Sequence, residues 1–231
     1  MKNKTLKHIA IIPDGNRRWA REKGLPTIEG HRFAADKTIP KLYDTVMELG
    51  ISYCTLWALS PENFTRRTKV EINYLLQLLH FFIHKRIDEM NKKDIKLKII
   101  GDMSKLPKKF QNDLAQAEEK TKDNKSLTLI FGVNYGGRDE MVRAFNKILN
   151  SKPKVKNFKA GDFEHFLDTS GIPDPDLIIR TGGEKRTSGF MLWQSEYAEY
   201  AFLDKYFPDF TPQDLRSSIS DFLSSQRRFG R

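Results

Sequence analysis

The sequence has little that would stabilise a secreted protein or span a membrane. Its 231 residues contain a single cysteine, Cys54, so no internal disulfide can form. It has no run of about 18 apolar residues, the length that a membrane-spanning helix needs. The segment Met1–Lys7 is polar, so we expect no signal peptide and a cytoplasmic location.

Metal-binding patterns are also scarce. The five histidines form no Cys/His ligand cluster along the chain, so a zinc site is not expected. His80 and His84 are four residues apart on a predicted helix, a spacing that would suit a pair of metal ligands. No third ligand is evident near them in the sequence, and the metal interpretation is therefore the weaker one.

Acidic residues are outnumbered by basic ones, 30 to 40, which gives a formal net charge of +10. This excess favours anionic partners: phosphorylated substrates, nucleic acid or an acidic membrane surface. Lysines on a solvated surface would account for part of it. Hydrophobic residues make up 39% of the chain, enough for an ordinary core, and the length predicts a single domain over residues 1–231.

Strand and helix patterns alternate, which predicts an α/β fold with a largely parallel central β-sheet flanked by helices. The predicted strands are His8–Pro13, Ser52–Ala58, Lys96–Gly101, Leu127–Asn134 and Leu177–Arg180, with Met191–Trp193 as a shorter sixth. The predicted helices are Gly30–Leu49, Lys69–Asn91, Pro107–Lys122, Gly137–Leu149, Phe163–Leu167 and Pro212–Gln226. Ligands bind beyond the carboxyl ends of the strands in such sheets, so the segments that follow strands are candidate site segments.

The most informative of these segments is Asp176–Ser188, in which a short apolar run ends in Arg180 and is followed by two glycines, Arg186 and Ser188. Glycines let backbone N–H groups approach an anion, and the arginines add permanently charged donors. The segment is typical of a phosphate or diphosphate pocket. Taken alone, it would equally suit a tight turn with solvated arginines.

A second segment, His8–Ala20, repeats this design near the N-terminus. The apolar run Ile9–Ile12 ends in Pro13 and is followed by Asp14-Gly-Asn-Arg-Arg18. A carboxylate such as Asp14 can hold Mg²⁺, which usually binds one or two carboxylates together with substrate phosphates. Two anion-binding strand ends, one with a carboxylate, indicate two phosphorylated substrates and a metal.

Four further features need interpretation, and the first three each have two interpretations. Ser60–Arg67 is a polar segment that could bind a diphosphate or assist proton transfer, or could cap the next helix through Ser60 and Glu62. The apolar helix 70–90 could be a buried core helix or the wall of an apolar tunnel. Glu199, among aromatic residues, could be a surface residue or a second metal ligand. The basic tail 226–231 reads by itself as a frayed terminus.

Together these segments resemble the cis-prenyltransferase family, and most of all its bacterial undecaprenyl diphosphate synthases. The resemblance runs from about His8 to Gly230. It is carried by His8–Trp19, Gly30-His31, Ser60–Arg66, Ile99–Asp102, Asn134–Arg138, Arg180–Glu184, Trp193-Gln194, Tyr197–Glu199 and Arg227–Gly230. It implies condensation of isopentenyl diphosphate onto an allylic diphosphate, usually farnesyl diphosphate, by a Mg²⁺-dependent homodimer whose fold holds the growing chain in an apolar tunnel.

The resemblance also implies residue roles. Asp14 would bind Mg²⁺, Glu199 would be a second metal contact that the partner subunit can supply, and Asn63 would take part in proton transfer. The allylic diphosphate would lie among Gly15, Asn16, Arg17, Arg18, Trp19 and His31. A flexible loop over the site would contain Ser60, Pro61, Glu62, Phe64 and Arg66. The isopentenyl diphosphate clamp would consist of Arg180, Arg186, Thr187 and Ser188, with Arg228 and Gly230 reaching into the partner's site.

This sequence departs from the common pattern at five positions, which are Pro13, Arg17, Thr27, Pro61 and Phe64. Arg17 adds charge where a glycine is common, and Thr27 stands where an arginine commonly contacts the allylic diphosphate. Pro61 should stiffen its loop. The metal aspartate and the clamp are retained, so we expect activity with altered affinity for the allylic primer.

Other functions are less well supported. Trans-prenyltransferases rely on aspartate-rich helical motifs, and this chain has no adjacent Asp-Asp pair. A basic nucleic-acid-binding protein should show aromatic stacking platforms or a binding motif, and neither is evident. A non-catalytic subunit would not need Asp14, Asn63 and the two clamp arginines. The expected product is undecaprenyl diphosphate, a lipid-carrier precursor for cell-wall glycans, with a medium-chain product as the alternative and peripheral membrane contact for its release.

Overall fold

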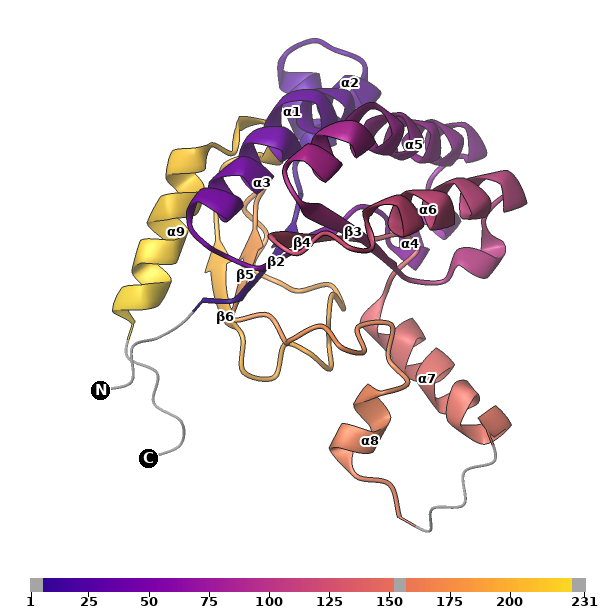
Figure 1. The fold of residues 1–231 in the computed structure, drawn as a ribbon. Helices are drawn as coiled ribbons and strands as arrows, with labels where there is room; N and C mark the ends of the chain where they lie inside the picture. Colours follow the sequence, from indigo (N-terminus) through magenta and orange to yellow (C-terminus); the bar gives the residue numbers. More distant parts are fainter. Residues whose placement is uncertain (1–5, 152–156, 226–231) are drawn as a thin grey trace.

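The computed structural model describes residues 6–151 and 157–225. Its centre is a parallel sheet of six strands in the order β3-β4-β2-β1-β5-β6 (Figure 1). The strands are β1 (His8–Ile12), β2 (Tyr53–Trp57), β3 (Ile95–Ile100), β4 (Leu127–Gly132), β5 (Leu177–Arg180) and β6 (Glu199–Phe202). The α/β prediction is therefore confirmed, and the first five strands lie where they were predicted. Apolar runs form the inner strands because parallel strands are covered on both faces.

Helices cover the sheet and extend beyond it. They are α1 (Asn16–Glu22), α2 (Thr27–Phe33), α3 (Ile39–Glu48), α4 (Pro61–Arg66), α5 (Lys69–Lys92), α6 (Lys108–Thr121), α7 (Gly137–Ser151), α8 (Ala160–Glu164) and α9 (Pro212–Ser224). The main core lies between one face of the sheet and helices that include α3, α5, α6 and α9. Figure 1 shows α7 and α8 projecting from the rest of the molecule.

The predicted sixth strand, Met191–Trp193, is wrong. Met191 has a left-handed φ of 47°, which an extended strand does not allow, and its segment forms turns. Only Phe190 and Met191 of this apolar run are fully buried, and they belong to a second core on the opposite face of the sheet, where Phe190 stacks on Trp57 at 5.0 Å. The sixth strand is instead Glu199–Phe202, a less buried edge strand.

The predicted helix Gly30–Leu49 is three elements. Between α2 and α3 lies a π-helical turn, η1 (Ala34–Thr38). Pro40 explains the interruption, because proline has no N–H to bond the carbonyl four residues earlier. That carbonyl belongs to Asp36 and accepts a hydrogen bond from Arg86 of α5 at 3.4 Å. The turn places Ala34 and Ala35 against the cavity described below.

Shorter helices were misplaced or missed. The helix predicted at Phe163–Leu167 lies at Ala160–Glu164, and α1 and α4 were not predicted as helices. The last helix ends at Ser224, close to the predicted end. No helix among the described residues is long and apolar enough to cross a membrane.

Candidate active site

The candidate site lies at the carboxyl ends of β2, β1 and β5, which are adjacent in the sheet. Asp14 follows β1, Ser60 follows β2, and Arg180 is the last residue of β5. A cavity of about 490 Å³ opens at this edge. The polar residues that line it are Asp14, Asn16, His31, Ser60, Glu62, Asn63, Arg66, Arg67, Arg180, Arg186 and Ser188. All but Arg67 are among the residues proposed from the sequence for the site.

Asp14 and Arg180 lie at the centre of these polar residues, which form the polar end of the cavity. The Arg180 side chain donates to Asp14 Oδ2 at 2.8 Å and to Ser188 Oγ at 2.9 Å, and also to the carbonyl of Arg186. Arg180 is buried, whereas the Asp14 carboxylate is about one-third exposed. The buried guanidinium therefore fixes the two clamp residues and the carboxylate in one arrangement.

Two backbone features hold the β1 and β5 ends together. Thr181 Oγ1 accepts from the Asp14 backbone N–H at 3.0 Å and donates to the Asp14 carbonyl at 2.8 Å. Gly182 has a φ of +86°, and a Cβ there would lie 2.7 Å from the Arg18 guanidinium and 3.1 Å from the Asp14 carbonyl carbon. A side chain at Gly182 would push these groups apart, so glycine is required where the strand ends meet. Thr181 belongs to the motif Arg180–Glu184, but no role was predicted for it from the sequence.

The electrostatics at Asp14 keep it ionised. Partial burial by itself would raise the pKa of Asp14, but hydrogen bonds from Arg180 and the Gly15 N–H, with the charges of Arg180 and Arg18, lower it below its usual value. Arg18 lies 3.3 Å from Asp14 Oδ1. Asp14 is thus a carboxylate at neutral pH, and its exposed oxygens face the cavity.

A second positive group surrounds His31. Burial and, to a smaller extent, the charges of Arg67 and Arg17 lower the pKa of His31 to about 3. Arg17, Arg67 and His31, with Thr27 and Glu71, line a small pocket next to the main cavity, and Glu71 lies 3.5 Å from Arg17. Nε2 of His31 and Nε of Arg17 are buried without a hydrogen-bond partner. His31 is neutral and lies between two arginines. A bound anion would offset the positive charges of these arginines.

The segment Ser60–Arg67 is the helix α4, preceded by its cap. The Ser60 N–H donates to Asn63 Oδ1 at 3.3 Å, so the capping partner of Ser60 is Asn63 and not Glu62 as predicted. Pro61 occupies the first turn, where proline is favoured. Because the Asn63 carbonyl oxygen is engaged by the cap, its amide NH₂ is the group available to the cavity.

Beyond the polar end, the cavity walls are apolar. They comprise Ala34, Ala35, Ile39, Ala58, Leu59, Leu75, Leu78, Leu79, Phe82, Phe131 and Phe207. Several of these belong to α5, so this helix lines a cavity as well as the core. Ala58, just after the end of β2, is one of the small residues of this wall. Leu76 and Ile83 are buried in the core and do not line it.

Several predicted binding residues lie next to the cavity without lining it. Gly15 donates to Asp14 at 2.6 Å, and Arg18 stacks over the ring of Tyr206 at 5.3 Å. Trp19 is buried and bonds Asp209 at 2.8 Å, which directs it away from the cavity. Phe64 packs on the main core. Thr187 is partly buried beside Ser188.

Glu199 is not near Asp14 within the chain. It begins β6 beside Leu177 at the start of β5, whereas Arg180 at the end of β5 is beside Asp14. Glu199 accepts from Ser225 Oγ at 2.6 Å. It could join the metal site only from a second copy of the chain. Arg228 and Gly230 lie outside the described residues.

The motifs Asn134–Arg138 and Trp193-Gln194 stabilise this region through buried hydrogen bonds. Tyr135 donates to the buried Glu140 at 2.7 Å, and Gln194 donates to Glu140 at 3.0 Å and to Thr169 at 2.7 Å. Burial raises the pKa of Glu140 although these hydrogen bonds oppose the rise. This network anchors the turns at 187–197, which carry Ser188 of the clamp.

Comparison with known proteins agrees with this geometry. The family model described as "Putative undecaprenyl diphosphate synthase" matches residues 12–230. An isoprenyl transferase of Clostridium perfringens is 42% identical, over 100% of this chain and 92% of its own length. A ditrans,polycis-undecaprenyl-diphosphate synthase of Micrococcus luteus, named as (2E,6E)-farnesyl-diphosphate specific, is 40% identical over 97% of this chain and 91% of its own.

Two solved structures share the fold over the full length. The lavandulyl diphosphate synthase of Lavandula x intermedia, in complex with dimethylallyl diphosphate, matches with a TM-score of 0.92 at 35% identity, covering 98% of this chain and 99% of that one. A "probable undecaprenyl diphosphate synthase" of Campylobacter jejuni matches with a TM-score of 0.82 at 33% identity, over 99% and 100%.

The fold, the polar strand ends and the apolar cavity thus define an isoprenyl transferase. The chain belongs to the cis-prenyltransferase family, that of the undecaprenyl diphosphate synthases.

Proposed function

We propose that this chain condenses isopentenyl diphosphate in cis onto farnesyl diphosphate to give a long-chain polyprenyl diphosphate of undecaprenyl length. One observation carries the proposal: a single cavity joins an arginine-rich polar end to apolar walls. A polyprenyl diphosphate has the same two parts, a dianionic head and an apolar chain. The similarity to the farnesyl-diphosphate-specific Micrococcus luteus enzyme supports the choice of primer and product.

The two groups of arginines support two diphosphate positions. His31, Arg17 and Arg67 would receive one diphosphate beside α1, together with Asn16 and the Gly15 turn. Arg180, Arg186 and Ser188 would receive the other, with Thr187 in the same turn. The group around His31 would bind the allylic substrate. The group around Arg180 would bind isopentenyl diphosphate. Guanidinium groups suit these roles because they donate several charge-assisted hydrogen bonds to phosphate oxygens.

The donor set at Asp14 fits Mg²⁺, because Mg²⁺ is bound by one or two carboxylates plus substrate phosphates. Asp14 is ionised, faces the cavity and lies beside both arginine groups. Bound there, Mg²⁺ would neutralise charge on the departing diphosphate. Within the described part of this chain, Asp14 would be its protein ligand, and Glu199 would contribute only from a partner subunit.

The chain's own residues would support the reaction in four ways. Arg17, Arg18 and Arg67 offset the negative charge that develops as the allylic C–O bond breaks. Arg180 and Arg186 hold isopentenyl diphosphate so that its double bond can form the new C–C bond. The proton released in that step would pass to a diphosphate oxygen, with the Asn63 amide and Ser60 orienting the acceptor. The apolar wall of α5 and η1 would then receive the lengthening chain.

The homodimer is part of this proposal. Val142, Phe145 and Leu149 share one face of α7, and each is more than half exposed. Their spacing forms an apolar stripe on a projecting helix, which a second copy of α7 could cover. Such a dimer would also provide a route for Glu199 to reach a partner's site. Because so apolar a product must pass into a membrane, we propose a cytoplasmic enzyme that contacts the membrane surface when it releases the product.

Arg186→Ala tests the clamp. The Arg186 side chain is 61% exposed, so its removal should leave the fold intact. We expect the KM for isopentenyl diphosphate to rise by roughly tenfold or more, in line with the loss of a charge-assisted hydrogen bond, while the KM for farnesyl diphosphate changes little. Arg216→Ala is the matched control, because Arg216 on α9 is partly exposed and, like Arg186, pairs with a glutamate. An unchanged KM for isopentenyl diphosphate would remove Arg186 from the clamp.

A further inference from the structure

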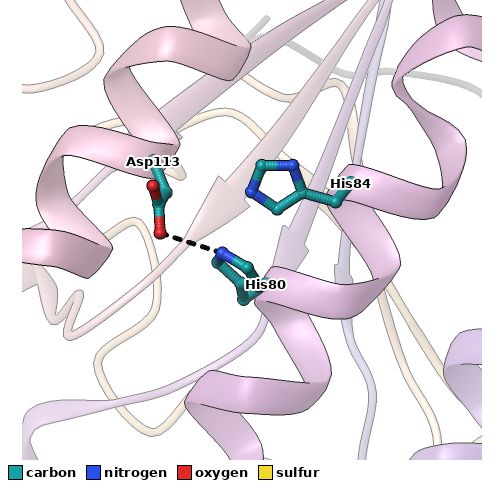
Figure 2. Close-up of side chains that lie close together, drawn as sticks. All are labelled: His80, His84 and Asp113. Atoms are coloured by element: carbon teal, nitrogen blue, oxygen red, sulfur yellow. Dashed lines mark hydrogen bonds and ion pairs between the residues drawn. The ribbon is translucent and has the colours of Figure 1, made fainter.

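Outside the cavity, three potential metal ligands converge where α5 packs against α6. His80 and His84 project from α5, and Asp113 projects from α6 (Figure 2). Their ligand atoms all lie within 4.8 Å of one another. Across residues 6–151 and 157–225, this is the one group of at least three His, Cys, Asp or Glu side chains found with ligand atoms so close.

The helices place these groups for simple reasons. Residues four apart lie on the same face of a helix, so the two imidazole rings are neighbours one turn apart, with centroids 4.1 Å apart and planes tilted by 52°. Phe110 and Leu114 of α6 are buried in the main core. Asp113 lies between them in the sequence and is therefore held close to α5. His80 Nε2 and Asp113 Oδ2 are 2.9 Å apart. Asp113 is the third ligand that the sequence did not reveal, because it is 33 residues from His80.

The spacing suits a small divalent ion. Two ligands of a tetrahedral zinc at about 2.0–2.1 Å lie about 3.3 Å apart. The distance between His80 Nε2 and Asp113 Oδ2, 2.9 Å, is near this value. The ligand atom of His84 lies within 4.8 Å of both, so a small side-chain movement would bring it to the same ion. The His80 side chain is 38% exposed and that of Asp113 is 20% exposed, so an ion could enter from solvent and a water could complete its coordination.

The donor set also selects the kind of metal. Two imidazole nitrogens with one carboxylate oxygen favour Zn²⁺, Co²⁺, Ni²⁺ or Cu²⁺, because imidazole suits these ions. Mg²⁺ prefers oxygen ligands and would remain at Asp14. The chain would therefore hold two chemically distinct metal positions.

We propose that His80, His84 and Asp113 bind a divalent transition metal, with Zn²⁺ as the representative ion, and that this ion fixes α5 to α6. The consequence reaches the cavity, since Leu78, Leu79 and Phe82 line it from the same stretch of α5. A metal that fixes this stretch restrains one wall of the cavity. This inference does not depend on the reaction proposed above.

The test is direct binding of Zn²⁺ to full-length, untagged protein after removal of metals by a chelator. Isothermal titration with zinc chloride in a non-chelating buffer, with excess Mg²⁺ present, should show one site per chain. Co²⁺ in place of Zn²⁺ gives a visible absorption band as a second signal. In a thermal scan, Zn²⁺ should raise the Tm of the wild type.

Two variants and two controls assign the site. His84→Gln and Asp113→Asn should each weaken Zn²⁺ binding at least about tenfold and abolish the rise in Tm. His165→Gln, an exposed histidine after α8, and Asp14→Asn should bind Zn²⁺ like the wild type. The Tm without metal shows that each variant is folded. No Zn²⁺ binding by the wild type, or equal binding by the wild type, His84→Gln and Asp113→Asn, would overturn the proposal.

Discussion

At the scale of single residues, the site depends on how the β1 and β5 ends meet. Thr181 bonds the Asp14 backbone, Gly182 leaves room for it, and Arg180 holds its carboxylate. Without substrate, Asp14 neutralises part of the charge of Arg180 and Arg18. A diphosphate and its Mg²⁺ would take over these partners. Asp14 therefore has two roles in the proposed function, as metal ligand and as counter-ion of the empty clamp.

Asp14→Asn separates these roles from the fold. The amide has the same shape and keeps one acceptor oxygen, for either the Gly15 N–H or Arg180, so we expect a folded protein. Turnover should fall by roughly 10²–10³-fold, because the site loses the charge that holds Mg²⁺ and with it the electrostatic stabilisation of the leaving group. Steady-state kinetics at saturating Mg²⁺, with circular dichroism as the folding control, measure this. Wild-type turnover in the variant would contradict the metal assignment.

His8 gives a residue-scale prediction about stability. Burial lowers the pKa of His8 from 6.5 to about 4, while its ring bonds the Pro173 carbonyl at 2.6 Å and Thr55 Oγ1 at 2.8 Å. As the pH falls below 6.5, the unfolded chain binds a proton that the folded chain does not. His8 should therefore cost about 1.4 kcal/mol of stability per pH unit between pH 6.5 and 4.

The variant His8→Asn keeps a donor for the Pro173 carbonyl but cannot titrate in this range. Urea unfolding at pH 7 and pH 5 should show a stability loss on acidification that is about 2 kcal/mol smaller in the variant than in the wild type. His31 contributes a loss of the same sign in both proteins, so the comparison isolates His8. Equal losses in the two proteins would show that His8 is not buried in its neutral form.

At the scale of elements, the cavity is made by α5, η1 and the end of β2. The π-helical turn brings Ala34 and Ala35 to the cavity, and Ala58 follows β2. Small side chains at these points leave space that the apolar residues of α5 enclose. In the proposed function, the length of product depends on this space and not on the diphosphate groups.

Ala58→Leu should therefore shorten the products. The added side-chain atoms would occupy the cavity and stop elongation earlier, while the first condensation continues at a rate within about tenfold of the wild type, because the polar end is unchanged. Chromatography of radiolabelled products by chain length measures the shift. Ala115→Leu, exposed on α6, is the control. If the two variants and the wild type gave the same longest product, Ala58 would not limit the chain.

Element by element, the sequence allowed most of the sheet to be predicted, because buried parallel strands are continuous apolar runs. Met191–Trp193 was wrongly predicted as a strand because Phe190 and Met191, buried in the second core with Tyr135, begin an apolar run that looks like a strand. The edge strand Glu199–Phe202 was missed because its residues are only partly buried. The helices α1 and α4 escaped prediction because each has at most seven residues, most of them polar, and so shows no apolar periodicity.

The candidate site could be predicted where it depends on segments that end strands. Asp14, Ser60, Asn63 and Arg180 all line one cavity, as the parallel sheet requires. Relations between distant segments could not be predicted. The contact of His80 with Asp113 and the position of Glu199 at the opposite end of the strands depend on packing and strand register, which no local pattern contains.

At the scale of the whole molecule, the projecting helix α7 presents an apolar stripe that the proposed dimer would cover. Phe145→Asp places a charge in the centre of this stripe and should shift the protein from dimer to monomer, because an unpaired charge at an interface is costly. Light scattering coupled to gel filtration measures the mass. Asn150→Asp, exposed on the same helix, should remain a dimer. A wild type that is monomeric at the concentrations used for activity would contradict the dimer.

The proposed function has one most direct test. Purified protein is incubated with farnesyl diphosphate, labelled isopentenyl diphosphate, Mg²⁺ and detergent, and the products are separated by chain length. We predict a ladder of polyprenyl diphosphates whose longest member has undecaprenyl length. No incorporation of label with farnesyl or geranyl diphosphate would contradict the proposed synthase activity, and Thr27 and Pro61 would then be the first positions to vary.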